Sequence, residues 1–547
     1  MKKSFSLWDY LWYATPIFLE GFTAGWETGS IGGILAMPQF LSYFNYPSAF
    51  RQGSMTACLI AGEFGGSLFM GFFLADRLGR KRTIYVAAAI YLIGQIIVVA
   101  SVAQGMFIVG RVLNGFGAGG LIQTVPLYTA EIAPVWIRGR LGYNLNAGTA
   151  LGLFATYWVQ YGSQNIHNNG SWRMPLSLQF VPILILIGLM IPRPESPRWL
   201  FMQDRGDEAL MVLAKLHGMG NQNDETVRAE YEEIRIINDY EKTMPAPSLY
   251  ALFFKKEYRR RTILGAGIQF LHEISGPNIC LYYAPKVFTQ VGVSGTQASL
   301  LANGINGALL VVTSLTLMWM ADKYGRRNQM IFGPICMGTC FVVVGAIMRG
   351  YGSPHWDSTT QSVQFSFVNK AASKAAIAFM YLYMASFGAI YCAVGQTYPN
   401  EVFSLRARGR GTALGASMNW LVNFWLGLYI PYALNQASWK LYFVFAGFNY
   451  MNTILCYVFF PETALRTLFS EEIDLLFTPD RTVFVFLDKE ATRKGRLLHA
   501  DLADGETVGQ EMKKALGSLG HVESWSSELS PRSQEVKKAQ LSHEEVV

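Results

Sequence analysis

The sequence predicts an all-α membrane protein with twelve transmembrane helices in two pseudo-symmetric halves of six helices each. Two observations lead to this prediction. The first is composition: 51% of the 547 residues are hydrophobic and only 15% are charged, whereas soluble domains carry roughly 25% charged residues. The second is an internal repeat, in which similar charged blocks follow matching apolar segments of the two halves.

Long apolar stretches recur along the chain between short charged loops. A helix of about 20 apolar residues crosses the hydrocarbon core of a bilayer, and these stretches are apolar all round, as segments that face lipid or other helices are. We expect twelve spans, at 12–36, 55–75, 83–103, 106–128, 141–162, 176–192, 262–285, 297–321, 329–349, 375–397, 411–434 and 439–460.

These spans divide the chain into five parts. We expect an N-terminal segment 1–11, a six-helix half 12–198, a loop 199–261, a second half 262–477 and a tail 478–547. The loop is charged and has helical periodicity, as in "EALMVLAKLHG", so it should form short amphipathic helices. The tail is polar, poor in aromatics and rich in Ser, Glu and Lys, a composition typical of disorder.

Positive charge is uneven between the two sides of the predicted membrane. The short loops at 76–82, 134–140, 322–327 and 402–410 carry twelve Lys or Arg, against seven in the longer segments on the opposite side. Because positive loops stay in the cytoplasm, we expect both termini and the loop and tail to be cytoplasmic. The sequon Asn169-Gly170-Ser171 then lies outside, where it can be glycosylated.

Charge and cysteine content exclude other classes of protein. The net charge of +7 is not a nucleic-acid signal, because Lys and Arg sit mainly in short loops rather than on one helix face or in a basic tail. All six cysteines lie inside apolar stretches and are expected to be small buried hydrophobes. We expect no metal site and no cofactor.

The repeat connects three pairs of motifs at matching helix positions. The pairs are "ADRLGRKR" at 75–82 with "ADKYGRRN" at 321–328, "YTAEIAPVWIRG" at 128–139 with "YPNEVFSLRARG" at 398–409, and "PESPR" at 194–198 with "PETALR" at 461–466. Matched blocks in matched places imply a duplication of a six-helix unit. Such duplicated folds bind their ligand between the halves, near the middle of the membrane.

These motifs resemble the sugar porter family of the major facilitator superfamily, and its fungal members most of all. The resemblance covers about residues 10–477 and rests on an ordered set that also includes "GRVLNGFGAGG" at 110–120, "WRMPLSLQ" at 172–179 and "NWLVNF" at 419–424. It implies a transporter that works by alternating access and not an enzyme. No G-x-x-x-x-G-K-[ST] motif is present, so ATP-driven transport is not expected.

Acids and arginines recur at the predicted cytoplasmic helix ends. They can form charge-assisted pairs across the two halves in one transport state and break them in the other, which would make them a gate. The alternative is a positive cluster that only sets topology. The candidate gate residues are Asp76, Arg80, Glu131, Arg138, Glu195, Arg198, Asp322, Arg326, Glu401, Arg408 and Glu462.

Glu27 is a carboxylate inside the first predicted span. The resemblance implies a proton-coupling acid at this position, where other members have Asp, and gives it Arg111 of span four as partner. An intramembrane carboxylate is costly and marks function by default; the alternative is a static buried ion pair. Glu20 and Glu63 also lie at membrane depth, and for each we expect a helix–helix hydrogen bond.

The resemblance also implies a sugar site, because amides pair with sugar hydroxyls as both donor and acceptor. Span seven reads "HEISGPNICLYY" and is similar to a family pattern that has two Gln residues where this chain has His272 and Glu273. In span ten, Gln396 stands where the family usually has Trp. The candidate substrate residues are Asn146, Gln269, His272, Glu273, Asn278, Tyr282, Tyr283, Gln396, Asn419, Trp420 and Asn423.

We therefore expect a proton-coupled sugar symporter in the plasma membrane, with a small sugar, protons and membrane lipid as partners and no nucleic acid. The alternatives are a transporter-like nutrient sensor and an uncoupled facilitator. The three replaced positions predict that glucose is not the best substrate and that a more polar or larger sugar, or a sugar acid, outcompetes it. The other interpretation is sequence drift in a hexose carrier.

Overall fold

The computed structural model describes residues 7–243, 247–291, 293, 296–320, 325–357, 362–367, 369–403 and 407–463. The expected tail 478–547 and the candidate gate residue Asp322 lie outside this part of the chain. The side chains of Arg138, Gln396 and Arg408 also lie outside it, although their helices are described.

The first half consists of helices that follow the expected spans. Their bounds are α1 Leu7–Ile34, α2 Pro38–Tyr43, α3 Ala49–Phe69, the π-helical turn η1 Met70–Leu74, α4 Ala75–Leu78, α5 Arg80–Val99, α6 Gln104–Ile132, α7 Val135–Ser163, α8 Gly170–Ser177 and α9 Phe180–Met190. α3, η1 and α4 together make the second span, and α8 with α9 makes the sixth.

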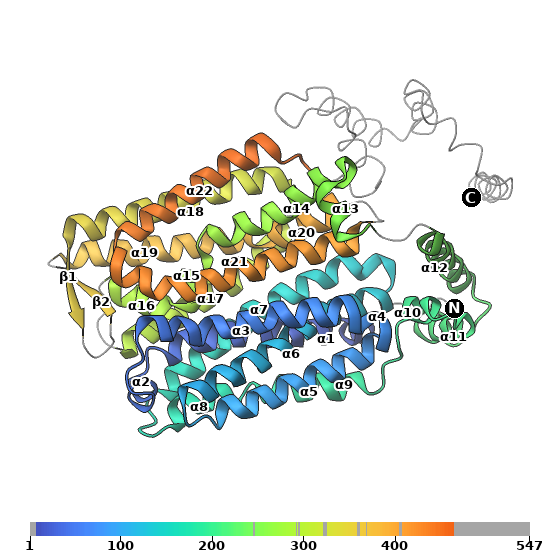
Figure 1. Ribbon diagram of the computed structural model, residues 1–547, viewed down its shortest axis with the longest axis horizontal. Coiled ribbons are helices and arrows are strands. Elements are labelled where there is room, and N and C mark those ends of the chain that lie inside the picture. The colour runs from blue at the N-terminus through green and yellow to red at the C-terminus, as the bar shows by residue number, and fades with distance from the viewer. Residues whose placement is uncertain are drawn as a thin grey trace. The chain divides into compact units, whose positions relative to one another are not determined.

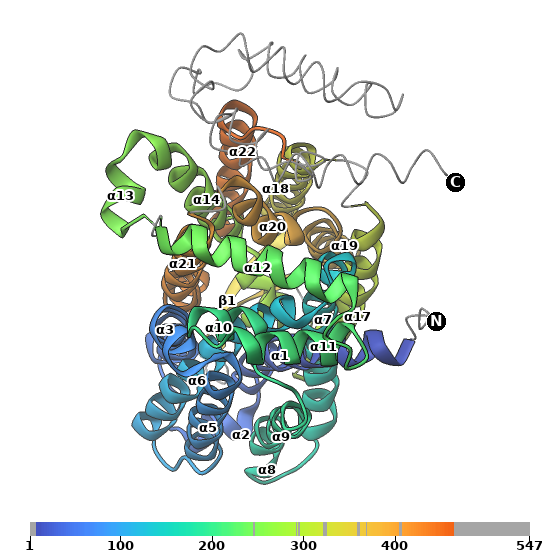
Figure 2. The same cartoon turned by 90° about the vertical axis from the view of Figure 1, so that its right-hand side faces the viewer.

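Four helices follow in the long internal loop. They are α10 Pro197–Met202, α11 Gly206–His217, α12 Glu225–Thr243 and α13 Leu249–Phe254. His217 fixes part of this loop, because its Nδ1 lies 2.6 Å from Glu230 of α12 and its Nε2 lies 3.2 Å from the carbonyl of Ile132 in α6. Figure 2 shows α10, α11 and α12 lying across one end of the helices, which we call the loop end.

The second half repeats the arrangement with more interruptions. Its elements are α14 Lys256–Ile274, α15 Pro277–Tyr282, α16 Ala284–Gln290, α17 Thr296–Met320, α18 Arg326–Tyr351, β1 Gly352–Asp357, β2 Ser362–Phe367, α19 Lys370–Ser386, the π-helical turn η2 Phe387–Tyr391, α20 Cys392–Val402, α21 Arg408–Ala437 and α22 Lys440–Phe459. α14 to α16 make the seventh span, and α19 to α20 make the tenth.

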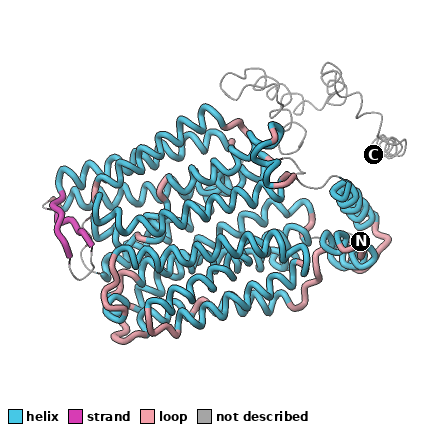
Figure 3. The backbone as a smooth tube through the Cα atoms, viewed as in Figure 1, coloured by secondary structure: helices cyan, strands magenta, loops and turns pink. Residues whose placement is uncertain are grey.

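A β-hairpin stands where the sequence indicated only a loop. β1 and β2 pair antiparallel from Gly352 opposite Phe367 to Asp357 opposite Ser362. Figure 3 shows these strands at the end of the helices opposite the loop helices, and we call this the hairpin end.

The prediction of a twelve-helix membrane fold in two six-helix halves is confirmed (Figure 1). Among the described residues, six helical segments are long and apolar enough to cross a membrane by length and composition alone: Arg80–Val99, Gln104–Ile132, Gly170–Met190, Arg326–Tyr351, Lys370–Tyr391 and Lys440–Phe459.

Glycine allows neighbouring spans to approach at backbone distance. A Cβ added at Gly25 of α1 would lie 2.0 Å from the carbonyl oxygen of Thr149 in α7. A Cβ added at Gly119 of α6 would lie 2.1 Å from the carbonyl oxygen of Glu63 in α3. Close backbone approach through small residues is the usual way in which membrane helices associate.

The two halves meet tightly toward the hairpin end. Gly32 of α1 lies against α15, where a Cβ would be 2.3 Å from the carbonyl oxygen of Tyr282. The Tyr157 hydroxyl of α7 donates to the carbonyl of Leu281 at 3.1 Å. The Lys286 ammonium of α16 donates to the Gln52 side chain of α3. These contacts close the space between the halves on this side.

Candidate functional site

A buried network of charged side chains lies at the loop end of the first half. The guanidinium of Arg80 donates to both carboxylate oxygens of Glu131, at 3.0 and 3.1 Å, and to Asp76 at 3.0 Å. The Ser196 hydroxyl donates to Glu131 at 2.5 Å. Glu195 accepts from the backbone N–H groups of Lys81 and Ser196. Bidentate Arg–carboxylate pairs of this kind are among the strong polar contacts of proteins.

The second half contains the same network at the corresponding positions. Arg326 donates to Glu401 at 3.3 Å, and the Thr463 hydroxyl donates to the other oxygen of Glu401 at 2.6 Å. Glu462 accepts from the backbone N–H groups of Arg326 at 2.7 Å and Arg327 at 3.0 Å. The internal repeat of the sequence is therefore also a repeat of hydrogen bonds.

A glycine with positive φ makes room for each network. Gly79 has φ +98° and Gly325 has φ +73°, a region that favours glycine. A Cβ at Gly79 would lie 2.6 Å from a carboxylate oxygen of Glu195, and a Cβ at Gly325 would lie 2.6 Å from one of Glu462. Each glycine turns the chain so that the following helix presents its first N–H groups to that carboxylate.

The gate residues whose side chains are described pair within their own half. Arg80 joins Glu131 and Asp76, and Arg326 joins Glu401. The sequence indicated pairs across the halves, and the ion pairs of the described residues at the loop end are not of that kind. Arg198 lies half-buried at the start of α10 and takes no part in the contacts described above. Ser196 and Thr463 were missed, although the repeated motifs place a hydroxyl residue after each acid.

Glu27 and Arg111 are both fully buried inside the first half. Their charges interact electrostatically. Within the described part of the chain, however, neither oxygen of Glu27 and none of the three guanidinium nitrogens of Arg111 has a hydrogen-bond partner. Burying an ionised group without hydrogen bonds costs several kcal/mol. The Glu27–Arg111 pair is therefore sensitive to a change in the protonation of Glu27 or in its contacts.

Two further carboxylates surround this pair. Glu20 and Glu63 are 2% and 4% exposed, and both interact electrostatically with Glu27. Among the described residues, neither Glu20 nor Glu63 forms the side-chain hydrogen bond to another helix that the sequence led us to expect. The interior of the first half thus gathers three acids around one arginine.

The interior of the second half is a network of amides around one carboxylate. Glu273 of α14 accepts from the amide of Asn278 at 2.6 Å and from the amide of Asn419 in α21 at 2.7 Å. The same amide nitrogen of Asn419 donates to Gln269 at 3.0 Å. His272 Nδ1 lies 3.1 Å from Glu273. Four of the sequence-predicted substrate residues are therefore brought directly together with Glu273.

The break in the seventh span makes this network possible. α14 ends at Ile274, Gly276 takes φ +98°, and Pro277 begins α15, a position where its missing N–H costs nothing. The chain turns so that Asn278 reaches back to Glu273. Broken helices in membrane proteins occur where backbone and side-chain polar groups line a ligand site.

The remaining substrate candidates whose side chains are described lie outside the Glu273 network. Asn423 donates to the Tyr282 hydroxyl at 3.3 Å, and Trp420 lies half-buried on the same helix. Tyr283 instead donates to the carbonyl of Gly427 at 2.6 Å, so its hydroxyl holds α21 in place. Asn146 lies half-buried on α7.

Tyr391 of the π-helical turn η2 is a residue that the sequence did not indicate. Its ring stacks on His272 with centroids 5.4 Å apart and an interplanar angle of 19°. Its hydroxyl accepts from Asn452 of α22 at 2.6 Å. The π-turn rotates the helix face relative to a regular α-helix, which explains why helical periodicity did not place Tyr391 at the site.

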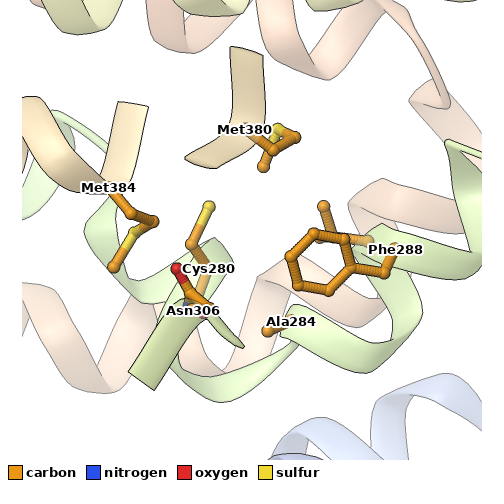
Figure 4. A pocket seen from close by; sticks show the side chains of 7 residues that line it. Cys280, Ala284, Phe288, Asn306, Met380 and Met384 are labelled. Carbon is orange, nitrogen blue, oxygen red and sulfur yellow. The ribbon is translucent and has the colours of Figure 1, made fainter. Parts of the chain in front are cut away.

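A small space between α15, α16, α17 and α19 is lined mostly by apolar side chains (Figure 4). Its lining residues are Cys280, Ala284, Val287, Phe288, Asn306, Met380 and Met384. It has no room for a water molecule, whereas ligand pockets usually measure roughly 300–1,000 Å³ and offer convergent polar groups. The space is therefore a packing gap and not the sugar site.

Comparison with known proteins agrees with the sequence motifs. Residues 13–477 match the model of the family described as "Sugar (and other) transporter". The chain is 33% identical to a "High-affinity glucose transporter" of Kluyveromyces lactis over 84% of this chain and 83% of that one. It is also 33% identical to the "MFS glucose transporter mfs1" of Aspergillus flavus over 95% and 99%.

The fold is similar to that of a solved bacterial transporter. The inward open conformation of the xylose transporter XylE from E. coli superposes with a TM-score of 0.67 at 21% identity, over 84% of this chain and 98% of that one. The likeness shows a multi-pass membrane fold, and the family model and the relatives are those of transporters. The chain belongs to the sugar (and other) transporter family.

Proposed function

We propose that the protein is a proton-coupled symporter that carries a sugar through the plasma membrane by alternating access. The observation that supports this most is the state of Glu27 and Arg111, which are fully buried without hydrogen-bond partners among the described residues. A pair so placed changes its energy strongly when the carboxylate gains a proton. That sensitivity is what coupling a proton to a conformational change needs.

The amide network of the second half supports a sugar as the cargo. Gln269, Asn278 and Asn419 gather around Glu273. α15 and α21, which carry Asn278, Asn419 and Asn423, contact α1 and α3 of the first half. Amides offer both donors and acceptors to hydroxyls. Two of the relatives reported above are named as glucose transporters. We propose a hexose or a related neutral polyol as the substrate class, with His272, Glu273 and Gln396 tuning which one is preferred.

The loop-end networks support a gating role for their residues. Each joins helix ends of one half to the segment that follows its last span, so we propose that each half moves as a unit. Arg138 and Arg408 occupy matching positions in the repeated motifs and are proposed to pair with these networks when the loop end closes. We propose that the loop end and both termini face the cytoplasm. Asn169 is then available for glycosylation at the outer surface.

Uptake of labelled sugars by cells that lack their own sugar transporters tests the proposal. A symporter accumulates its sugar above the external concentration and loses this accumulation when a protonophore is added. Equilibration without accumulation would show an uncoupled facilitator. Absence of uptake for every sugar, in cells where the protein reaches the surface, would favour a sensor and overturn the proposal.

A further inference from the structure

The hydrogen bonds of Glu273 fix how two amides are turned. Asn278 and Asn419 approach its carboxylate at 2.6 and 2.7 Å through their side-chain nitrogens. A carboxylate only accepts hydrogen bonds, so only the NH₂ end of an amide can face it. In most sites only the hydrogen-bond partners of an amide show which end is the oxygen and which is the nitrogen. Here the carbonyl oxygens of Asn278 and Asn419 must be the ends left for a ligand.

Two further acceptors of the network are left for a ligand. Asn419 uses the second N–H of its amide on Gln269 at 3.0 Å, so its nitrogen has no N–H left to give. His272 Nδ1 lies against Glu273 at 3.1 Å; when it donates there, Nε2 of the neutral ring is an acceptor. Nε2 of His272 has no partner in the described part of the chain, and neither has the buried carbonyl oxygen of Asn423.

Positive charge is scarce by comparison. Among the described residues, the network still leaves donors for a ligand in the Gln269 amide, the Tyr282 hydroxyl and the second N–H of the Asn278 and Asn423 amides. A protonated His272 would be balanced by Glu273 beside it, so the pair adds no net positive charge. The charged groups that interact with the Tyr282 hydroxyl are Glu63, Glu273 and Arg111, two acids against one base. No Lys or Arg of the described residues is hydrogen-bonded to this network.

We infer that Glu273 is a positioning residue that turns the amides of the site into acceptors, so that the transporter selects neutral sugars and polyols and rejects sugar acids. Neutral sugars bring hydroxyl donors to these acceptors. A uronate brings a second acceptor-only, negative group, and like charges and unpaired acceptors in a buried site oppose binding. This inference rests on the proposed function and narrows its substrate class. It excludes the sugar acid that the replaced positions left open as a preferred substrate.

Matched sugar pairs provide the test. Glucose and glucuronate, and galactose and galacturonate, differ only at C6, where a carboxylate replaces a hydroxymethyl. We expect each uronate to inhibit uptake of a labelled neutral sugar at least tenfold more weakly than its neutral partner, roughly the effect of one lost charge-assisted contact. Equilibrium binding to the purified full-length protein, with all measurements at one pH, should give the same ratio.

Three variants separate the role of Glu273 from general damage. Glu273→Gln keeps the shape but lets the amides turn, so the ratio should fall about tenfold toward equality. Glu20→Gln makes the same chemical change in α1 and should leave the ratio as it is. Asn419→Leu removes one of the turned amides and should lower the ratio while Glu273 remains, so it tests the same arrangement if Glu273→Gln does not fold.

Three results would overturn the inference. If the uronates bind the parent as tightly as the neutral sugars while uptake persists, selectivity against acids is absent but the proposed function stands. If the ratio is large but the same in Glu273→Gln, Glu273 does not set it. Loss of uptake and binding of every neutral sugar in the parent would sink the proposed function and this inference together.

Discussion

The two halves of the molecule are alike at the loop end and unlike inside the membrane. Arg80, Glu131 and Ser196 of the first half correspond to Arg326, Glu401 and Thr463 of the second, with an arginine and a hydroxyl donating to the glutamate in each. Halfway along the helices the likeness ends. The first half buries acids around Arg111, whereas the second arranges amides around Glu273.

This difference indicates a division of labour after duplication. The shared network holds helix ends together in both halves, which any rocking motion between two rigid units requires. The interiors were free to specialise, because each faces the other across the site. We therefore interpret the first half as the proton half and the second as the sugar half.

The largest effect is expected from Glu27→Gln. The amide keeps the shape but takes no proton at ordinary pH, so accumulation against a gradient should disappear and the pH dependence of uptake should flatten. Exchange of labelled for unlabelled sugar should persist within a few-fold, since the sugar half is intact. Glu27→Asp serves as the control and should retain coupling. Full energised accumulation by the Gln variant would contradict the assignment.

The loop-end networks should differ in strength although they share a pattern. Glu131 accepts from two nitrogens of Arg80, at 3.0 and 3.1 Å, whereas Glu401 accepts from Arg326 at 3.3 Å. Breaking a buried pair costs about 3–5 kcal/mol, so Glu131→Ala should lower the melting temperature and the uptake rate more than Glu401→Ala. Equal effects, or a reversed order, would show that these distances do not reflect the strength of the pairs.

Arg138 and Arg408 are expected to act on rate rather than on binding. Arg138→Ala and Arg408→Ala should each weaken transport while equilibrium sugar binding to the purified protein stays within about twofold, because both positions lie at helix ends far from the amide network. Arg138→Lys and Arg408→Lys are the matched controls, since a retained positive charge should keep part of the rate. Loss of sugar binding in a folded Ala variant would count against a gate.

A smaller effect is expected where the halves touch toward the hairpin end. Lys286 donates to Gln52 across the halves. Lys286→Met removes this contact and keeps the length of the side chain, so the closed hairpin end should lose roughly 1–3 kcal/mol. Labelling of a cysteine placed nearby by a membrane-impermeant reagent should become faster. Unchanged labelling in Lys286→Met would mean that the contact does not hold this end closed.

The smallest effect is expected from Tyr391→Phe. The change removes the hydroxyl that accepts from Asn452 at 2.6 Å but keeps the ring stacked on His272. A loss of about 1 kcal/mol of stability follows from one hydrogen bond, with sugar selectivity unchanged. A shift in selectivity would show that the hydroxyl itself contacts the sugar.

The sequence predicted the architecture well because composition and repeats report directly on it. Spans, halves and the matching of Glu131 with Glu401 follow from apolar length and motif position. The break at Gly276, the π-turn that brings Tyr391 to His272 and the β-hairpin after α18 do not, because each depends on local backbone geometry rather than on periodicity. The orientation of the amides around Glu273 needed the three-dimensional contacts, since sequence gives a residue type and not its partner.

The division between a proton half and a sugar half is tested most directly by sugar-evoked proton movement in proteoliposomes. A pH-sensitive dye inside vesicles that contain the purified protein should report acidification when a transported sugar is added outside. We predict that Glu27→Gln binds the sugar but gives no acidification, whereas Glu273→Gln acidifies in proportion to the sugar that it still carries. Acidification that survives in Glu27→Gln, or that is lost in Glu273→Gln while sugar still enters, would contradict the account.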